Sequence, residues 1–585
     1  MAAAPVRSLR AHLDLLRARG ELREVSCEVD PWLEIAEVHR RVVAARGPAL
    51  LFTKVKGSAF PVATNLFGTE ERASLAFGPR PKEFVARVVE AAHTLLPPTL
   101  GKLWRVRGLL KEGLRVGTKK VRKGPVTEVE EATDLARLPA TTSWRSDGGP
   151  FLTLPLVHTE HPVTGKPNLG IYRMQIHSKA TTGMHFQIHK GGGFHHHEAE
   201  RLGRDLPATV FLGGPPALVL AAIAPLPEDV PEILLASLLL GERLPRVVGR
   251  GPHPIVAEAE FALVGRVAAR ERAPEGPFGD HFGYDSLAHD YPVFHVDRVF
   301  RRKDAIFPAT VVGPPRQEDF YLGDFLQDLL SPLFPLVMPS VRAIWAFGET
   351  GFHSLAAAQV KERYPREALG TAMRILGEGQ LSLTKVLVVT DADVSLRDGK
   401  AVLECALERM DWRTDCVVLG ETAQDTLDYT GPKVNRGSKA ILLAVGEPRR
   451  ALPTSFEGAL PAGVARAVPF CRGCLVLEGL PYADEPTQAV RVAKHAAFSD
   501  WPLLVLVDDA ADAARSTERF LWTTFTRMEP AADLHAREKV TARFHTGLVP
   551  PVVIDARMKP GYPKVMVVDP ETRALVDRNW PSYGL

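Results

Sequence analysis

Hydrophobic positions near the N-terminus follow helical spacing and then give way to short apolar runs. Asp30 and Pro31 form a helix start signal, an N-cap residue followed by proline at the first helical position. Ile35, Val38 and Val42 then recur at the spacing of one helical face. The pattern predicts a small mixed α/β unit, with helices over 8–18 and 32–45 and strands over 48–52 and 60–68.

Between about residues 126 and 310 the apolar runs are short and are interrupted by glycine and proline. Such runs are typical of the strands of a barrel or a sandwich. The run VPEILLASLLLG among them is expected to be a helical insertion. The runs that we expect to be strands are FLTLPLVHT, NLGIYRMQI, ATVFLGG, ALVLAAIA, IVAEAEFALVGRV and PVFHVDRVF.

Beyond residue 340 the apolar runs become continuous and end in Asp or Gly. The runs KVLVVTDAD (385–393), AILLAVG (440–446) and PLLVLVDDA (502–510) are typical of buried parallel strands with helices between them. The segment 351–379 is predicted to be a helix broken at Pro365, and no internal repeat is recognised.

These patterns predict three domains. The first is an N-terminal α/β domain over 1–125, which ends in a basic linker from about 97 to 125. The second is a central β domain over 126–325, and the third is a C-terminal α/β domain over 326–585.

Composition excludes several classes of protein. Lys plus Arg number 72 and Asp plus Glu 69, so the net charge is only +3. The run KKVRK (119–123) is short, and we expect a solvated loop there rather than a nucleic-acid surface. Neither a signal peptide nor a run of about 18–20 uncharged apolar residues is visible, so no membrane span is expected.

The five cysteines are few for a chain of this length and favour a reducing, cytoplasmic setting. Cys471 and Cys474 form a lone CxxC pair. We interpret the pair as structural or incidental ahead of a metal or redox site, and its role stays open.

The candidate chemistry begins in the stretch 168–189, which holds an amide, a guanidinium and an imidazole. Asn168 and His189, together with Glu232 further along, suit a divalent metal ion that also holds a phosphate. Arg173 with two later acids suits a substrate carboxylate and a proton donor. Those two acids, Glu275 and Asp280, lie in APEGPFGDHFGYD, where the residues alone favour a glycine-rich turn with solvated acids over a catalytic site.

The same region is rich in histidine, which also invites a zinc interpretation. His185 and His189 are four residues apart, but the glycines at 183 and 191–193 argue against a continuous helix that would align them. Each histidine is therefore interpreted as a surface or internally satisfied side chain, and a zinc-dependent hydrolase stays open as an alternative. The histidines of this region are His177, His185, His189, His195, His196 and His197.

Several motifs in order resemble the UbiD family of reversible, non-oxidative decarboxylases. They are NLFGTEER (65–72), NLGIYRMQ (168–175), HKGG (189–192), PEGPFGDHFGY (274–284), TKVLVVTDADVSLRD (384–398) and, more weakly, RGSKAIL (436–442). The tail after about residue 520 resembles the longer branch linked to quinone biosynthesis. The resemblance implies a central flavin-binding split β-barrel flanked by an N-terminal α/β unit and a C-terminal α/β domain that mediates oligomerisation.

The resemblance also implies a cofactor, prenylated FMN, held through its phosphate by Mn²⁺ or Mg²⁺, with K⁺ as a possible companion. The implied metal ligands are Asn168, His189 and Glu232. Lys439 would neutralise phosphate charge. The remaining residues implied to contact the flavin are Thr153, Ile171, Arg173, Ala222 and Pro225.

The implied catalytic set is Arg173, Glu275 and Asp280, in which Glu275 orients Arg173 and Asp280 returns a proton to the carbon that loses CO₂. His281 is expected to touch substrate or to tune Asp280, and Lys190 stands where the family pattern has arginine. No role is predicted for the triplet His195–His197.

The implied function is decarboxylation of an aromatic or α,β-unsaturated acid, first in quinone (ubiquinone or menaquinone) precursor biosynthesis and alternatively in aryl-acid catabolism. The implied partners are the acid, CO₂, a flavin prenyltransferase that supplies the cofactor, and further copies in a homodimer or homohexamer. A non-catalytic scaffold is a further alternative, against which the intact acid and arginine set argues.

Overall fold

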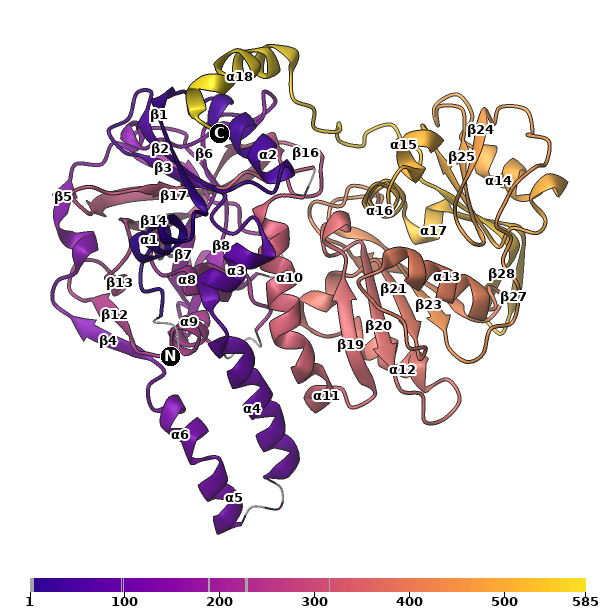
Figure 1. Cartoon of the computed structure of the whole chain (residues 1–585), viewed down its shortest axis with the longest axis horizontal. Helices are drawn as coiled ribbons and strands as arrows, with labels where there is room; N and C mark the ends of the chain where they lie inside the picture. The colour runs from indigo at the N-terminus through magenta and orange to yellow at the C-terminus, as the bar shows by residue number, and fades with distance from the viewer. Residues whose placement is uncertain (1–4, 96, 98, 188–189, 227–229, 315) are drawn as a thin grey trace. The chain divides into compact units, whose positions relative to one another are not determined.

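The computed structural model describes residues 5–95, 97, 99–187, 190–226, 230–314 and 316–585 (Figure 1). Its contacts divide the chain into two compact units. The first unit comprises residues 1–329 and 564–585, and the second comprises residues 330–563. Among the described residues, no helix combines the length and the apolar composition needed to cross a bilayer.

The first unit opens with the predicted α/β unit. Ser8 caps the first helix, since its side chain accepts from the backbone N–H of Ala11. A four-stranded sheet in the order β1-β2-β3-β18 follows, and α18 near the C-terminus packs against α2. The elements are α1 (Leu9–Ala18), β1 (Leu22–Val29), α2 (Glu34–Ala44), β2 (Ala49–Val55), β3 (Val62–Thr64), α3 (Glu70–Phe77), α4 (Arg80–Thr94), β18 (Phe307–Pro308) and α18 (Pro570–Tyr583).

The segment predicted to be a linker, 97–125, instead contains two helices and a strand: α5 (Leu100–Arg105), α6 (Arg107–Gly113) and β4 (Thr118–Val121). Thr99 starts α5 by accepting from the backbone N–H of Lys102 at 3.3 Å. Glu112 of α6 bonds to Arg87 of α4 at 2.5 Å, so this segment folds back on the preceding helix. The prediction was wrong because glycine and proline here mark turns between short helices rather than an unstructured connection.

The centre of the first unit is an antiparallel β sheet. Its strands follow the order β10-β17-β14-β11-β7-β8, and β5 pairs with β17. Within the described part of the chain no pair joins β8 to β10, so closure into a split barrel stays a prediction. The strands are β5 (Val129–Glu131), β7 (Leu156–Glu160), β8 (Pro167–Ile171), β10 (Thr181–Gly183), β11 (Leu206–Leu212), β14 (Phe261–Glu275) and β17 (His289–Arg301).

Short strands and helices complete this region. The predicted insertion 230–241 is confirmed as a helix. The remaining elements are β6 (Phe151–Leu152), β9 (Met174–Gln175), α7 (Gly191–Arg201), α8 (Pro216–Ile223), α9 (Glu232–Leu240), β12 (Leu244–Val247), β13 (Ile255–Val256), β15 (Phe278–Gly279), β16 (Asp285–Ser286) and α10 (Glu318–Leu330).

One predicted strand, ALVLAAIA, is wrong, since it forms the helix α8. Pro216 at the first helical position fixes a backbone angle suited to a helix, and alanine and leucine favour that state. A short apolar run bounded by Gly and Pro cannot be assigned from its periodicity alone.

The second unit contains two five-stranded sheets. The predicted parallel strands are confirmed as β21, β23 and β26. The elements of the first sheet region are α11 (Phe334–Val337), β19 (Val341–Ala346), β20 (Leu355–Val360), α12 (Glu367–Ile375), β21 (Val386–Thr390), α13 (Gly399–Arg409), β22 (Cys416–Ala423) and β23 (Arg436–Ala444). Those of the second are β24 (Arg466–Cys471), β25 (Cys474–Glu478), α14 (Gln488–Ala493), β26 (Leu503–Val507), α15 (Ala510–Ala514), α16 (Thr517–Thr526), α17 (Pro530–Asp533), β27 (Leu534–Ala542) and β28 (His545–Asp555).

The helix predicted over 351–379 is only partly correct. Residues 355–360 form β20 between two other strands, and helix α12 begins at Glu367, after Pro365. Alanine-rich LAAAQV favours a helix locally, but pairing with β19 and β21 overrides that preference.

The two sheets have the same topology, which the sequence did not reveal. The strand orders are β19-β20-β21-β23-β22 and β24-β25-β26-β28-β27. In each sheet the central strand pairs in parallel with both of its neighbours, and each neighbour pairs antiparallel with an edge strand. We call residues 341–444 the first module and residues 466–555 the second module.

Candidate active site

Arg173 is the centre of a buried network in the first unit. It lies between β8 and β9, and its guanidinium donates through three nitrogens. Nε bonds to Glu275 Oε1 at 3.2 Å, Nη1 bonds to Asp280 Oδ2, and Nη2 donates to Ser286 Oγ at 3.0 Å. The guanidinium also lies over the Phe278 ring, 4.5 Å from its centroid. Every arm of the planar fork is therefore held by a group of the protein.

The two acids reach Arg173 from neighbouring elements. Glu275 is the last residue of the long strand β14, and Asp280 follows the short strand β15. A turn fixes Asp280, because its backbone carbonyl accepts from Gly283 N–H at 2.9 Å and its N–H donates to Tyr284 at 3.2 Å. Gly283 has φ +87°, a conformation that glycine adopts without strain.

Charge, rather than solvent, sets the protonation of this network. Burial alone would raise the pKa of Asp280, but Arg173 and then His281 outweigh it and hold that pKa well below its usual range. Burial is likewise outweighed at Glu275, whose pKa is lowered by His185 and Arg173. The two carboxylates overcome the effect of burial on Arg173 and raise its pKa. At neutral pH the resting network therefore contains one cation and two anions.

His185 is a member of the network that the sequence interpretation missed. Its Nδ1 lies 2.8 Å from Glu275 Oε1, the oxygen that Arg173 also contacts. Burial lowers the pKa of His185, so the ring is neutral at pH 7 and donates through Nδ1–H to the carboxylate. Its Nε2 lies 3.3 Å from the Gln187 amide, and its ring lies 4.2 Å from that of Tyr291. No sequence spacing connects position 185 with position 275.

The second oxygen of Glu275 has no hydrogen-bond partner among the described residues, although it is buried. It lies against Gly183, where an added Cβ would be only 2.5 Å away. A buried carboxylate oxygen without a partner is costly. A polar group of a bound cofactor or substrate would satisfy it, so the network fits a ligand-binding role.

The predicted metal ligands are only partly described. Glu232, at the start of α9, accepts from the backbone N–H of Leu169 at 2.9 Å, next to Asn168 on β8. The Asn168 amide contacts the Tyr172 hydroxyl at 3.4 Å, and its Oδ1 faces Gly191. An amide oxygen and a carboxylate are donors of the kind that suits Mg²⁺ or Mn²⁺. His189 lies outside the described residues.

Three family models match the chain in the order of its domains. They are the N-terminal, Rift-related and C-terminal domains of 3-octaprenyl-4-hydroxybenzoate carboxy-lyase (UbiD), over residues 13–92, 118–315 and 320–444. The chain belongs to the UbiD family. It is a UbiD-type carboxy-lyase, with the N-terminal, central β and C-terminal α/β domains of that family.

Relatives match over almost the whole length of this UbiD-family chain. An uncharacterized protein of Chlamydia trachomatis serovar D is 51% identical over 583 residues, which are 98% of this chain and 99% of that protein. A protein of Chlamydia pneumoniae, named as one of the subunits of a 4-hydroxybenzoate decarboxylase, is 51% identical over 578 residues, covering 98% of each.

Solved structures of UbiD-class enzymes share the fold. HmfF from Pelotomaculum thermopropionicum, in complex with FMN, matches with a TM-score of 0.62 and 25% identity, over 78% of this chain and 98% of that one. Vanillic acid decarboxylase from Sedimentibacter hydroxybenzoicus matches with a TM-score of 0.67 and 24% identity, over 78% and 96%. The second likeness concerns the fold alone.

The other residues that the UbiD resemblance implies lie in different places. Thr153 Oγ1 accepts from the backbone N–H of Thr310 at 2.9 Å. Ile171 ends β8, against which α8 packs, and α8 contains Ala222 and ends just before Pro225. Lys439 lies in the second unit, where its ammonium donates to the Thr384 carbonyl at 2.9 Å and burial lowers its pKa to about 8.

The histidine-rich segment supplies no metal cluster in the described part of the chain, where no three His, Cys, Asp or Glu side chains gather as a metal site. His185 bonds to Glu275, and His195 bonds to Thr159 Oγ1 at 2.9 Å. These contacts favour the interpretation of internally satisfied histidines over a zinc hydrolase. Cys471 and Cys474 are buried free thiols, and Cys474 packs in an apolar core.

Proposed function

We propose that this UbiD-type carboxy-lyase catalyses the reversible, non-oxidative decarboxylation of an aromatic acid with prenylated FMN. The observation that carries the proposal is Arg173, buried between Glu275 and Asp280 with every donor engaged. Burying an arginine with two carboxylates is costly, and a buried charge network of this kind is a candidate for a functional site.

Prenylated FMN, when bound, supplies an electron sink for the electron pair that remains on carbon when CO₂ leaves. Asn168 and Glu232, with His189, would hold its phosphate through Mn²⁺ or Mg²⁺, with K⁺ as a possible companion. The unpaired Oε2 of Glu275 supports contact with a polar group of the flavin or the substrate. Thr153, Ile171, Ala222 and Pro225 are proposed to line the flavin, and Lys439 to act on its phosphate charge.

Asp280 is the proton donor in this proposal. Asp280, an anion in the resting network, first takes up a proton from solvent. When the carbon–carbon bond to the carboxylate breaks, that proton goes to the same carbon, and in the carboxylation direction the Asp280 anion takes it back. Because Arg173 lowers the pKa of Asp280, the protonated acid releases its proton readily. His281 Nδ1 lies 2.6 Å from Asp280 Oδ1 and is placed to return a proton to that acid.

A 4-hydroxybenzoate-type acid is the first substrate to test, because a relative 51% identical to the chain is named for that activity. A place in quinone precursor biosynthesis is the finer proposal, which rests on the resemblance of the tail to the longer branch of the family. HmfF, solved with FMN and in an evolved dimeric form with prFMN, supports the choice of cofactor.

The test is mass spectrometry of the cofactor released from protein co-expressed with a flavin prenyltransferase, with a metal assay and turnover of 4-hydroxybenzoate on the same sample. We expect prenylated FMN, about one Mn²⁺ or Mg²⁺ for each site, and release of CO₂. Bound zinc without any flavin would overturn the proposal and favour the hydrolase alternative.

A further inference from the structure

The two modules of the second unit correspond residue by residue, not only strand by strand. Registers between neighbouring strands align Val386 with Ala440 in the first module and Leu503 with Val552 in the second. The same registers align Leu355 with Val386, and Cys474 with Leu503. Leu355, Val386 and Ala440 therefore correspond to Cys474, Leu503 and Val552.

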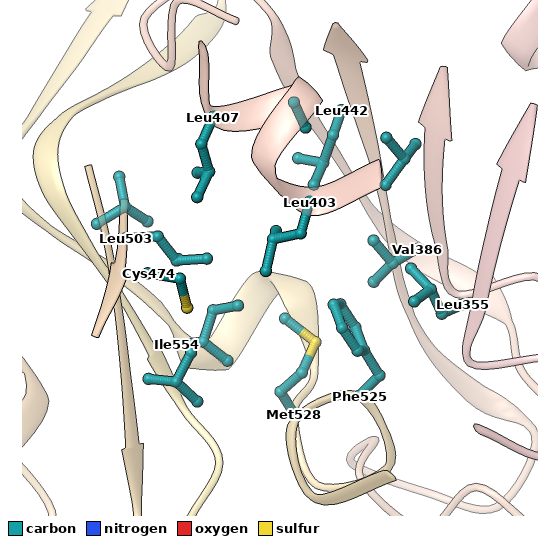
Figure 2. Packing of buried hydrophobic residues seen from close by; sticks show 14 of the residues in the cluster. Leu355, Val386, Leu403, Leu407, Leu442, Cys474, Leu503, Phe525, Met528 and Ile554 are labelled. Atoms are coloured by element: carbon teal, nitrogen blue, oxygen red, sulfur yellow. The ribbon is translucent and has the colours of Figure 1, made fainter. Parts of the chain in front are cut away.

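Equivalent residues also face equivalent sides. On β23, Ile441 and Leu443 pack in a core with α12, and on β28 Val553 packs in a core with α14. The alternate positions Leu442 and Ile554 both point to one further core, which the two modules share. Figure 2 shows this shared core, where side chains of both modules meet. A cavity of about 20 Å³ within it has an apolar lining and room for one water, so the core is closely packed.

Two of the polar contacts between the modules join similar places in the fold. The backbone N–H of Leu548, on β28, donates to the Trp412 carbonyl, which precedes the last hairpin of the first module, at 3.1 Å. The backbone N–H of Ala531, which precedes the last hairpin of the second module, donates to Ser438 Oγ, on β23, at 2.9 Å. Each contact thus joins the last strand of one module to the segment before the last hairpin of the other, an arrangement similar to that of an isologous two-fold interface.

We propose that the second module is an internal duplicate of the first, and that the two associate within one chain as subunits associate in a two-fold dimer. The shared face is then already occupied and cannot pair with another chain. A homodimer or homohexamer, as the family resemblance implies, would then form through other faces of the chain.

The second module has the buried apolar positions of the first module but lacks its two buried lysines. Lys385, which pairs with Asp428 at 2.6 Å, corresponds by register to Pro502, and Lys439 corresponds to Pro551. This difference is expected if the duplicate serves as a partner for the first module and not as a second polar site.

The test asks whether the duplicate behaves as a bound partner. Protease sites inserted after Glu447 and after Pro560, both exposed, would excise the second module from the folded protein. We expect the excised module to stay bound to the rest of the chain. Its release from the native protein would contradict the proposal.

A matched pair of variants separates the shared core from the core of one module. Leu442→Ala removes a side chain from the shared core, whereas Leu443→Ala, its neighbour on β23, removes one from the core with α12. In the cleaved protein, Leu442→Ala should raise the dissociation constant of the excised module about tenfold or more. Leu443→Ala should change it only a few-fold, and equal effects of the two would count against the proposal.

Discussion

Replacing Arg173 by lysine keeps its charge but removes its fork, and the structure predicts a large effect. Arg173 donates to Glu275, Asp280 and Ser286 from three different nitrogens. A lysine ammonium is a single point of charge and cannot occupy all three positions. The buried carboxylates would lose part of their compensation, at a cost of about 3–5 kcal/mol in the free energy of unfolding.

Arg173→Lys should also alter catalysis and its pH dependence. A displaced Asp280 is expected to lower turnover by about 10²-fold. Because Arg173 holds the pKa of Asp280 below its usual range, the variant should raise that pKa toward its ordinary value. The limb of the pH–rate profile that reports the titration of Asp280, sought between about pH 4 and 8, should therefore move to higher pH.

Arg266→Lys is the matched control. Arg266 lies on β14 and donates from Nε and Nη1 to the carboxylates of Asp205 and Asp297, at 3.0 and 2.9 Å. Its side chain is 46% exposed, against 8% for Arg173, so its loss should cost only about 0–1 kcal/mol. Chemical denaturation of both variants gives the comparison. Equal, small losses in the free energy of unfolding of the two variants, together with an unshifted pH–rate profile of Arg173→Lys, would refute the reasoning.

Three further predictions follow from burial and charge. His185→Phe removes the hydrogen-bond donor to Glu275 and should weaken flavin binding, whereas His185→Asn, which keeps a donor, should weaken it less. Equal flavin affinities of the two variants would contradict the role of that donor. Burial lowers the pKa of His12 to about 4 and of His39 to about 3, so both rings stay neutral in the folded protein. The free energy of unfolding should therefore fall as the pH drops from about 6.5 toward 4, by about 3 kcal/mol for His12. Denaturation midpoints that stay constant over this pH range would contradict the prediction. Glu232→Gln should reduce bound Mn²⁺ or Mg²⁺, whereas Glu242→Gln, at an exposed pair with Arg7, should not; equal metal contents would count against the assignment.

The parts of the site that the sequence predicts are those carried by motifs. Arg173, Glu275 and Asp280 were expected to act together, and the structure brings them into contact across about a hundred residues. His185 was not expected there, because its contact with Glu275 depends on β17 lying between β10 and β14. Strand order of that kind leaves no local pattern in the chain.

The fold shows the same distinction. Continuous apolar strands such as β21 and β26 are predicted from hydrophobicity alone. LAAAQV took the state that its strand neighbours imposed, whereas ALVLAAIA is a short apolar run that followed the helix preference of alanine and leucine. The duplicated module escaped notice because the two copies share the alternation of buried faces and not residue identity. Leu355 corresponds to Cys474, for example, and Lys439 to Pro551.

The most direct test of the proposed chemistry is the turnover of Asp280→Asn, produced with the prenylated flavin and compared with Asp285→Asn. Asp285 lies five residues away and accepts from Ser146 Oγ at 2.7 Å, outside the Arg173 network. Loss of the proton donor should lower decarboxylation by about 10²–10⁴-fold while the flavin stays bound, and Asp285→Asn should stay within a few-fold of the unmodified enzyme. Near-normal turnover by Asp280→Asn with bound flavin would contradict the assignment of Asp280 as the acid.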